Sequence, residues 1–259
     1  FYAAGGWPTP RQTLWILVAM VSARSAAMVF NRIADFRFDA ENPRTRDRAL
    51  PAGRLSVRFA WGFTLTMIAL FLLSAAMLNP LCLKLAPVAL AITLGYSYTK
   101  RFTALCHGFL GLSLAIAPIG AWLAVRPDRA AHPLPYLFGA AVLFWIAGAD
   151  ILYACEDVEF DRRKGLRSVP AALGLRGAMI ASILCHVAAV GALGAAGWAG
   201  KLGPWYFAAV AAIALLLAYE HALVSPDDLR RVNRAFFHVN AAISVAILVG
   251  GLLDLFVGR

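Results

Sequence analysis

Two short acidic segments hold the residues whose types and spacing could do chemistry in this chain. The first reads NRIADFRFD over residues 31–39, and the second reads DILYACEDVEFD over residues 150–161. Most of the 14 acidic residues lie in the windows 35–47 and 150–161, each at the end of a long apolar run. Such a concentration of acid in an apolar chain requires a physical reason.

Helical periodicity turns each segment into a polar stripe. At about 100° per residue, the members of each set fall within about 80° of one another. The sets are Asn31, Asp35 and Asp39, and then Asp150, Asp157 and Asp161. Arg24, seven residues before Asn31, continues the first stripe inwards. Because ionisable residues inside an apolar bundle are costly, both stripes are expected to face its interior or a wet cavity.

The chemistry that suits these stripes is diphosphate binding. Facing carboxylates raise one another's pKa unless a cation compensates them. Oxygen ligands suit Mg²⁺, which binds one or two carboxylates together with substrate phosphates. Nearby basic residues complete this pattern; they are Arg44, Arg46, Arg48, Lys100, Arg101, Arg162, Arg163, Lys164 and Arg167. A single Asp at a helix end is more often a cap or a solvated charge, so the matched pair of stripes favours a metal site.

The elements that must position these stripes are membrane spans. The chain is 61% hydrophobic and 15% charged, with a mean hydropathy of +0.71, whereas soluble domains average about 25% charged residues. Continuous apolar runs predict an all-α, polytopic transmembrane helical bundle in one domain, residues 1–259. The expected spans are 11–36, 56–78, 81–99, 103–125, 134–156, 170–198, 204–224 and 235–257.

Loop charge predicts the orientation. Most Lys and Arg residues follow the first, third, fifth and seventh spans, which places those loops and both acidic segments in the cytoplasm. The net charge of +10 is therefore assigned to topology, and no nucleic-acid partner is expected. Eight spans put both ends outside, so we expect a ninth, N-terminal helix to be missing.

Several segments resemble the UbiA superfamily of intramembrane prenyltransferases, in particular its bacterial 4-hydroxybenzoate polyprenyltransferase-like branch of quinone biosynthesis. The matching segments are NRIADFRFD and the following DAENPRTRDRALPAGRLS, GYSYTKRFT (95–103), LAIAPIGAWLAV (114–125) and DILYACEDVEFDRRKGLRSVPAALG (150–174). The resemblance implies nine transmembrane helices around a central cavity. It also implies a bacterial inner-membrane enzyme whose active site faces the cytoplasm.

The resemblance implies a role for each site residue. Two Mg²⁺ ions would be held, one by Asn31, Asp35 and Asp39 and the other by Asp157 and Asp161. Additional diphosphate-binding residues would be Lys100, Arg101, Lys164, Arg167 and Arg46. Arg24 and Asp150 would bind the aromatic acceptor, Arg24 through a carboxylate and Asp150 through the phenolic hydroxyl, with Tyr153 beside them. His107 is expected to make only a hydrogen bond within the bundle.

The implied reaction transfers a polyprenyl group from a polyprenyl diphosphate to a ring carbon of a small hydroxylated aromatic carboxylate. Two acceptors stay open, 4-hydroxybenzoate and 1,4-dihydroxy-6-naphthoate of the futalosine menaquinone route. A cation transporter that uses the carboxylates as a pathway is the alternative of another class. It predicts acidic residues spread through the membrane depth, whereas here they gather at one face.

Overall fold

The computed structural model describes residues 1–225, 229, 232 and 235–258. Within these residues, eight helices are long and apolar enough to span a membrane. Each one overlaps a span expected from the sequence, from Pro10–Ala34 at the start to Phe237–Phe256 at the end. The predicted all-α membrane bundle is confirmed. The connection after the seventh span, assigned above to the basic side, lies partly outside the described residues.

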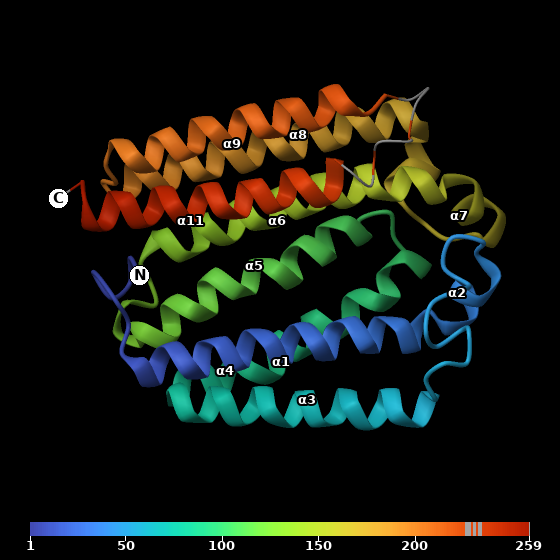
Figure 1. The fold of residues 1–259 in the computed structure, drawn as a ribbon, viewed down its shortest axis with the longest axis horizontal. Coiled ribbons are helices and arrows are strands. Elements are labelled where there is room, and N and C mark those ends of the chain that lie inside the picture. Colours follow the sequence, from blue (N-terminus) through green and yellow to red (C-terminus); the bar gives the residue numbers. More distant parts are fainter. Residues whose placement is uncertain (226–228, 230–231, 233–234, 259) are drawn as a thin grey trace.

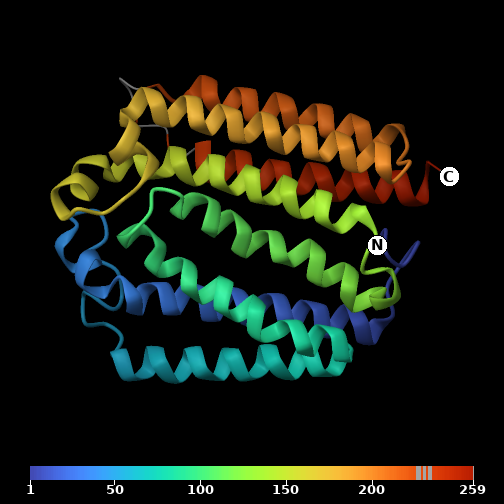
Figure 2. The same cartoon turned by 180° about the vertical axis from the view of Figure 1, so that it is seen from behind.

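The described helices follow one another with short connections. In order they are α1 (Pro10–Ala34), α2 (Phe36–Glu41), α3 (Val57–Leu78), α4 (Pro80–Gly95), the 3₁₀ turn η1 (Tyr96–Arg101), α5 (Cys106–Val125), η2 (Pro127–Arg129), α6 (Pro133–Ala154), η3 (Cys155–Asp157), α7 (Val158–Lys164), α8 (Val169–Ala199), α9 (Pro204–Leu223), the π-turn η4 (Ala235–Val239) and α11 (Asn240–Phe256). The long helices run roughly alongside one another (Figure 1). Both termini lie at one end of the bundle, and α2 and α7 lie at the other (Figures 1 and 2).

Local sequence sets where the helices begin. Thr9 forms a capping box with Gln12 at the start of α1, and Ser56 and Asn79 accept hydrogen bonds from backbone N–H groups that open α3 and α4. Such caps satisfy donors that a helix cannot pair internally. Proline occupies one of the first two positions of five helices, where its missing N–H costs nothing.

Helix α6 occupies the middle of the bundle because two glycines permit close approach. A Cβ on Gly111 of α5 would lie 2.3 Å from the carbonyl oxygen of Leu143 on α6. A Cβ on Gly148 of α6 would lie 2.4 Å from the imidazole of His186 on α8. Small residues allow helix backbones to pack tightly within a membrane, and here they bring α5 and α8 against opposite sides of α6.

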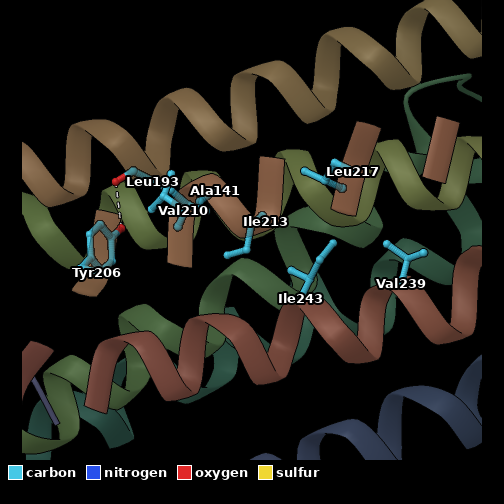
Figure 3. Close-up of a cluster of buried hydrophobic side chains, with 8 residues drawn as sticks. All are labelled: Ala141, Leu193, Tyr206, Val210, Ile213, Leu217, Val239 and Ile243. Carbon is cyan, nitrogen blue, oxygen red and sulfur yellow. Dashed lines mark hydrogen bonds between the residues drawn. The ribbon is translucent and has the colours of Figure 1, made fainter. Parts of the chain in front are cut away.

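Among the described residues, the largest buried apolar cluster joins α6, α8, α9, η4 and α11. Its members are Ala141, Leu193, Tyr206, Val210, Ile213, Leu217, Val239 and Ile243 (Figure 3). The Tyr206 hydroxyl donates to the carbonyl oxygen of Leu193 at 2.8 Å, which satisfies its buried polar group. At the terminal end of the same helices, Asp254 of α11 accepts hydrogen bonds from the first N–H groups of α9, at 3.0 Å from Gly203. This half of the protein therefore forms a tightly packed support.

Candidate active site

The first acidic segment, residues 31–39, was expected to form one straight helix, but it bends. Helix α1 ends at Ala34, and Asp35 has non-helical angles (φ −95°, ψ 8°) before α2 resumes. The Asp39 N–H still donates to the Asp35 carbonyl oxygen at 2.8 Å, so the helical turn is kept across the bend. Asn31, Asp35 and Asp39 consequently line the same cavity.

The second segment is interrupted in a similar way. Asp150 lies in α6, Asp157 ends the 3₁₀ turn η3, and Asp161 lies in α7. Gly165 directly follows α7 and caps it with a positive φ of 67°. Residues that carry a side chain rarely adopt this conformation. Both segments therefore depart from a continuous helix, yet the three aspartates meet one cavity.

That cavity has a volume of about 310 Å³ and lies between α1, α2, η1, α5, α6 and α7. It is lined by Asn31, Arg32, Asp35, Phe38, Asp39, Asn42, Arg44, Thr45, Arg48, Tyr96, Ser97, Thr99, Lys100, Arg101, Cys106, His107, Leu110, Asp150, Tyr153, Ala154, Asp157, Phe160, Asp161 and Leu166. Carboxylates, cations and aromatic rings thus share one space. The two acidic segments, more than 100 residues apart in the chain, form its polar end.

The carboxylates from the first segment contact protein cations. Asp39 Oδ1 lies 2.7 Å from Arg48 Nη1. Its Oδ2 is buried without a hydrogen-bond partner among the described residues, and lies 3.8 Å from Arg32. Asp35 accepts a hydrogen bond from the Asn31 amide at 3.0 Å, and lies 3.8 Å from Arg101. Burial raises the pKa of Asp35 to about 6, with a further rise from Asp39, so additional positive charge here would favour the ionised form.

The second segment is held by cations from other elements. Arg44, in the loop after α2, forms a two-point ion pair with Asp157, donating from Nε to Oδ1 at 3.0 Å. Asn42 donates to the same Oδ1 at 3.0 Å. Asp161 is almost fully buried and lies 2.8 Å from Lys100 Nζ. Ser168 donates to the Oδ2 of Asp161 at 2.8 Å. Loop 42–48 and η1 therefore bring positive charge onto both acidic segments.

The side-chain oxygens of Asn31, Asp35, Asp39, Asp157 and Asp161 are of the type that binds Mg²⁺. All are carboxylate or amide oxygens, and Asp39 supplies a buried oxygen that no hydrogen bond satisfies. Among the described residues, however, no three His, Cys, Asp or Glu side chains lie close enough together to hold a metal by themselves. Mg²⁺ commonly takes only one or two carboxylates and fills its other positions with water and phosphate oxygens. The residues present fit that mode of binding.

The structure separates the predicted diphosphate ligands into two groups. Lys100 and Arg101 line the cavity. Arg46 is exposed and does not line it. Lys164 instead pairs with Glu41 on the surface, and the Arg167 guanidinium donates to the Phe102 carbonyl oxygen at 2.9 Å. Arg46, Lys164 and Arg167 are therefore close to the site in sequence but do not line the cavity.

Arg24 and Asp150 were both expected to bind the acceptor, but the structure places only Asp150 in the cavity. Arg24 is exposed on α1 and does not line the cavity. Asp150 instead lies 2.7 Å from His107 of α5. The role of Arg24 in binding a carboxylate on the acceptor therefore stays a prediction. Tyr153 does line the cavity, where its hydroxyl accepts a hydrogen bond from Arg44 at 2.7 Å.

Arg44, Arg48 and His107 line the cavity, but the sequence did not identify the carboxylates that they contact. The two arginines were visible as basic neighbours of the first stripe, but their partners are on other elements and spacing does not identify them. His107 follows the GYSYTKRFT segment, with no second ligand at helical spacing. Its partner is 43 residues away, so only the packing of α5 on α6 reveals the contact.

Comparison with known proteins gives one consistent result. The sequence profile described as the UbiA prenyltransferase family matches residues 1–241. A 4-hydroxybenzoate octaprenyltransferase from Aromatoleum aromaticum is 33% identical over 95% of this chain and 84% of its own length. The apo structure of a UbiA homologue from Aeropyrum pernix K1 is 35% identical, with a TM-score of 0.91 over 98% of this chain and 93% of that chain.

A more distant structure shares the fold. It is a UbiA homologue from Archaeoglobus fulgidus bound to DMAPP and Mg²⁺, 20% identical, with a TM-score of 0.68 over 96% of this chain and 93% of that chain. At this identity the likeness concerns the arrangement of the helices alone.

Proposed function

Because the chain belongs to the UbiA prenyltransferase family, we propose that it is an aromatic polyprenyltransferase acting on a small hydroxylated aromatic carboxylate of the 4-hydroxybenzoate type. The donor is a polyprenyl diphosphate. One observation carries the proposal: the two acidic segments, the second of which includes Asp150, share a cavity with five cations. These cations are Arg32, Arg44, Arg48, Lys100 and Arg101. The family and the relatives named 4-hydroxybenzoate octaprenyltransferase support the same reading.

The diphosphate binds at the acidic end. Asn31, Asp35 and Asp39 would hold one Mg²⁺, and Asp157 and Asp161 would hold another. When bound, the metal supplies Lewis-acid stabilisation of the diphosphate as leaving group. The guanidinium and ammonium groups now paired with the carboxylates then become available to phosphate oxygens, to which Arg binds with two parallel hydrogen bonds. In this exchange, Mg²⁺ would neutralise the carboxylates, and the Arg and Lys side chains would neutralise the diphosphate.

The residues that line the cavity can support both the cleavage of the donor and its bonding to the acceptor. The C–O bond between the allylic carbon and the diphosphate breaks, and its electron pair leaves with the diphosphate. Aromatic side chains, Phe38, Tyr96, Tyr153 and Phe160, restrict water that would quench the allylic cation. Asp150 accepts a hydrogen bond from the acceptor hydroxyl, which makes the ring more nucleophilic. A ring carbon bonds to the allylic carbon and then loses its proton, which the departing diphosphate takes up.

The position of the carboxylates argues against a transport pathway. The site carboxylates line one cavity, and α2 and α7, which carry Asp39 and Asp161, lie at one end of the bundle (Figure 1). The positive-inside rule places that end in the cytoplasm, and we assign the protein to a bacterial inner membrane with this cavity facing the cytoplasm.

The assay that tests the function uses purified full chain with Mg²⁺ and a long-chain polyprenyl diphosphate. The acceptor panel includes 4-hydroxybenzoate, 1,4-dihydroxy-6-naphthoate and a phenol without a carboxylate. We expect product with a carboxylated acceptor and its loss in Asp35→Ala. Absence of product with every acceptor, together with unchanged behaviour of Asp35→Ala, refutes the enzyme assignment.

The same panel tests Arg24. If this residue binds the carboxylate of the acceptor, Arg24→Ala impairs the carboxylated acceptors selectively and leaves the uncharged phenol largely unaffected. An equal loss for all acceptors removes Arg24 from the acceptor site.

A further inference from the structure

His107 and Asp150 form a buried pair at the inner side of the cavity. His107 belongs to α5 and is only 3% exposed, whereas Asp150 belongs to α6 and its side chain is 26% exposed. His107 Nδ1 lies 2.7 Å from Asp150 Oδ2. On the far side of the imidazole, the backbone N–H of Val169 in α8 donates to Nε2 at 3.2 Å. One imidazole therefore connects three helices.

The contact with α8 determines where the imidazole carries its proton. A neutral imidazole has one donor and one acceptor nitrogen. Because the Val169 N–H needs an acceptor, Nε2 must present its lone pair. The proton consequently resides on Nδ1, and Nδ1–H donates to the Asp150 carboxylate. A backbone group of known polarity thus fixes the tautomer, as is common where a histidine orients a functional carboxylate.

The hydrogen bond leaves one oxygen of Asp150 for other use. Oδ2 is taken by His107, and no hydrogen bond to Oδ1 occurs within the described part of the chain. Asp150 lines the cavity and its side chain is 26% exposed, so Oδ1 is the oxygen left for a further hydrogen bond. Without the imidazole, the carboxylate is free to rotate about χ2, a torsion with a broad and roughly two-fold preference.

We propose that His107 is a positioning residue that holds the Asp150 carboxylate with Oδ1 directed at the hydroxyl of the aromatic acceptor. This inference rests on the proposed function. His107 and Asp150 are held by separate helices, so the carboxylate is already oriented before the acceptor binds. The free energy of orienting it is therefore not spent in each catalytic cycle. The role concerns the acceptor, whereas the cations around Asp35, Asp39, Asp157 and Asp161 concern the diphosphate.

Two amide substitutions separate this role from simple packing. In His107→Asn, the amide nitrogen falls near the place of Nδ1 and can donate to Asp150. In His107→Gln, the amide falls near the place of Nε2, where it meets the Val169 N–H and not the carboxylate. Positioning predicts that Asn keeps a kcat close to that of the wild type. Gln is expected to lower kcat by about 10–100-fold, as misplacement of a reacting group does, with an unchanged KM for the diphosphate.

A cycle with Asp150→Asn provides the second measurement. If His107 acts through Asp150, His107→Gln causes little further loss of kcat in the Asp150→Asn background. Equal losses in His107→Asn and His107→Gln, a better Gln than Asn variant, or additive losses in the cycle each overturn the proposal. The thermal unfolding midpoint of every variant is measured beside its kinetics.

NMR of the histidine side chain tests the positioning role of His107 independently of the proposed enzymatic activity. In ¹⁵N-histidine-labelled protein, the His107 signals are identified by their disappearance in His107→Asn. They should report a neutral imidazole protonated at Nδ1. An Nε2-protonated ring overturns the positioning role even if no acceptor is turned over. Turnover by the wild type with indistinguishable variants overturns only this inference, whereas absence of any product overturns the proposed function.

Discussion

Removing the guanidinium that holds Asp157 should make this carboxylate easier for Mg²⁺ to bind. In the structure Arg44 donates from two nitrogens to Asp157. The proposed metal must displace this contact before it can use the carboxylate. Hydrogen bonds to charged groups contribute about 1.5–3 kcal/mol. With 29% of the Arg44 side chain exposed, solvent screening reduces the cost of displacement to about 1–2 kcal/mol.

Arg44→Met removes that competitor. With about 1.4 kcal/mol for each factor of ten, the Mg²⁺ concentration for half-saturation should fall by about 5–30-fold. The assay is thermal unfolding of purified protein titrated with MgCl₂ in the absence of diphosphate, so that a loss of phosphate contacts does not enter. Without Mg²⁺ the variant should unfold at a lower temperature than the wild type, because Asp157 loses the two hydrogen bonds from Arg44 and keeps the one from Asn42.

Arg46→Met is the matched control. Arg46 lies in the same loop, is exposed and does not line the cavity, so its loss changes the same formal charge without freeing Asp157. A wild-type half-saturation in Arg44→Met, or an equal fall in Arg46→Met, refutes the reasoning that Arg44 and the metal compete for this carboxylate. Asp157→Asn should weaken the response to Mg²⁺.

Three further predictions concern the surroundings of the site. Asp254→Leu leaves backbone donors at the start of α9 without their acceptor and should cost about 1–3 kcal/mol of stability, measured as a lower unfolding midpoint with the cavity chemistry intact. Gly148→Ala forces a methyl group to 2.4 Å from the imidazole on α8 and should destabilise by about 1–3 kcal/mol through overpacking, whereas Gly191→Ala, which meets open space, should not destabilise. Ser168→Ala removes the hydrogen bond to Oδ2 of Asp161 and the side-chain cap of α8, so the free energy of unfolding without Mg²⁺ should fall by about 1–2 kcal/mol; an unchanged unfolding midpoint would contradict this role of the hydroxyl.

Apolar run length was sufficient to predict the membrane-spanning helices. A membrane span must pair all its backbone groups internally and must be long enough to cross the hydrocarbon region. These requirements act on contiguous residues, and all eight expected spans are therefore present among the described helices. Helical spacing also predicted that Asn31, Asp35 and Asp39 share one face. This spacing is kept across the bend after Ala34 because the Asp39 N–H still donates to the Asp35 carbonyl oxygen.

Partnerships across the bundle required the tertiary structure. Sequence spacing places Lys164 and Arg167 near the site, but their side chains contact Glu41 and the Phe102 carbonyl oxygen and do not line the cavity. Arg44, from the loop after α2, does line the cavity.

The sequence by itself determined which carboxylates gather, because the chemistry of buried acid and the helical period are properties of short segments. Only the tertiary structure decided which group orients Asp150. Arg24 shares a helical face with the first stripe, whereas His107 reaches Asp150 from another helix at 2.7 Å. A hydrogen bond of that length depends on how closely α5 packs against α6. Glycine at position 111 permits this approach, but its consequence for Asp150 becomes visible only when the helices are assembled.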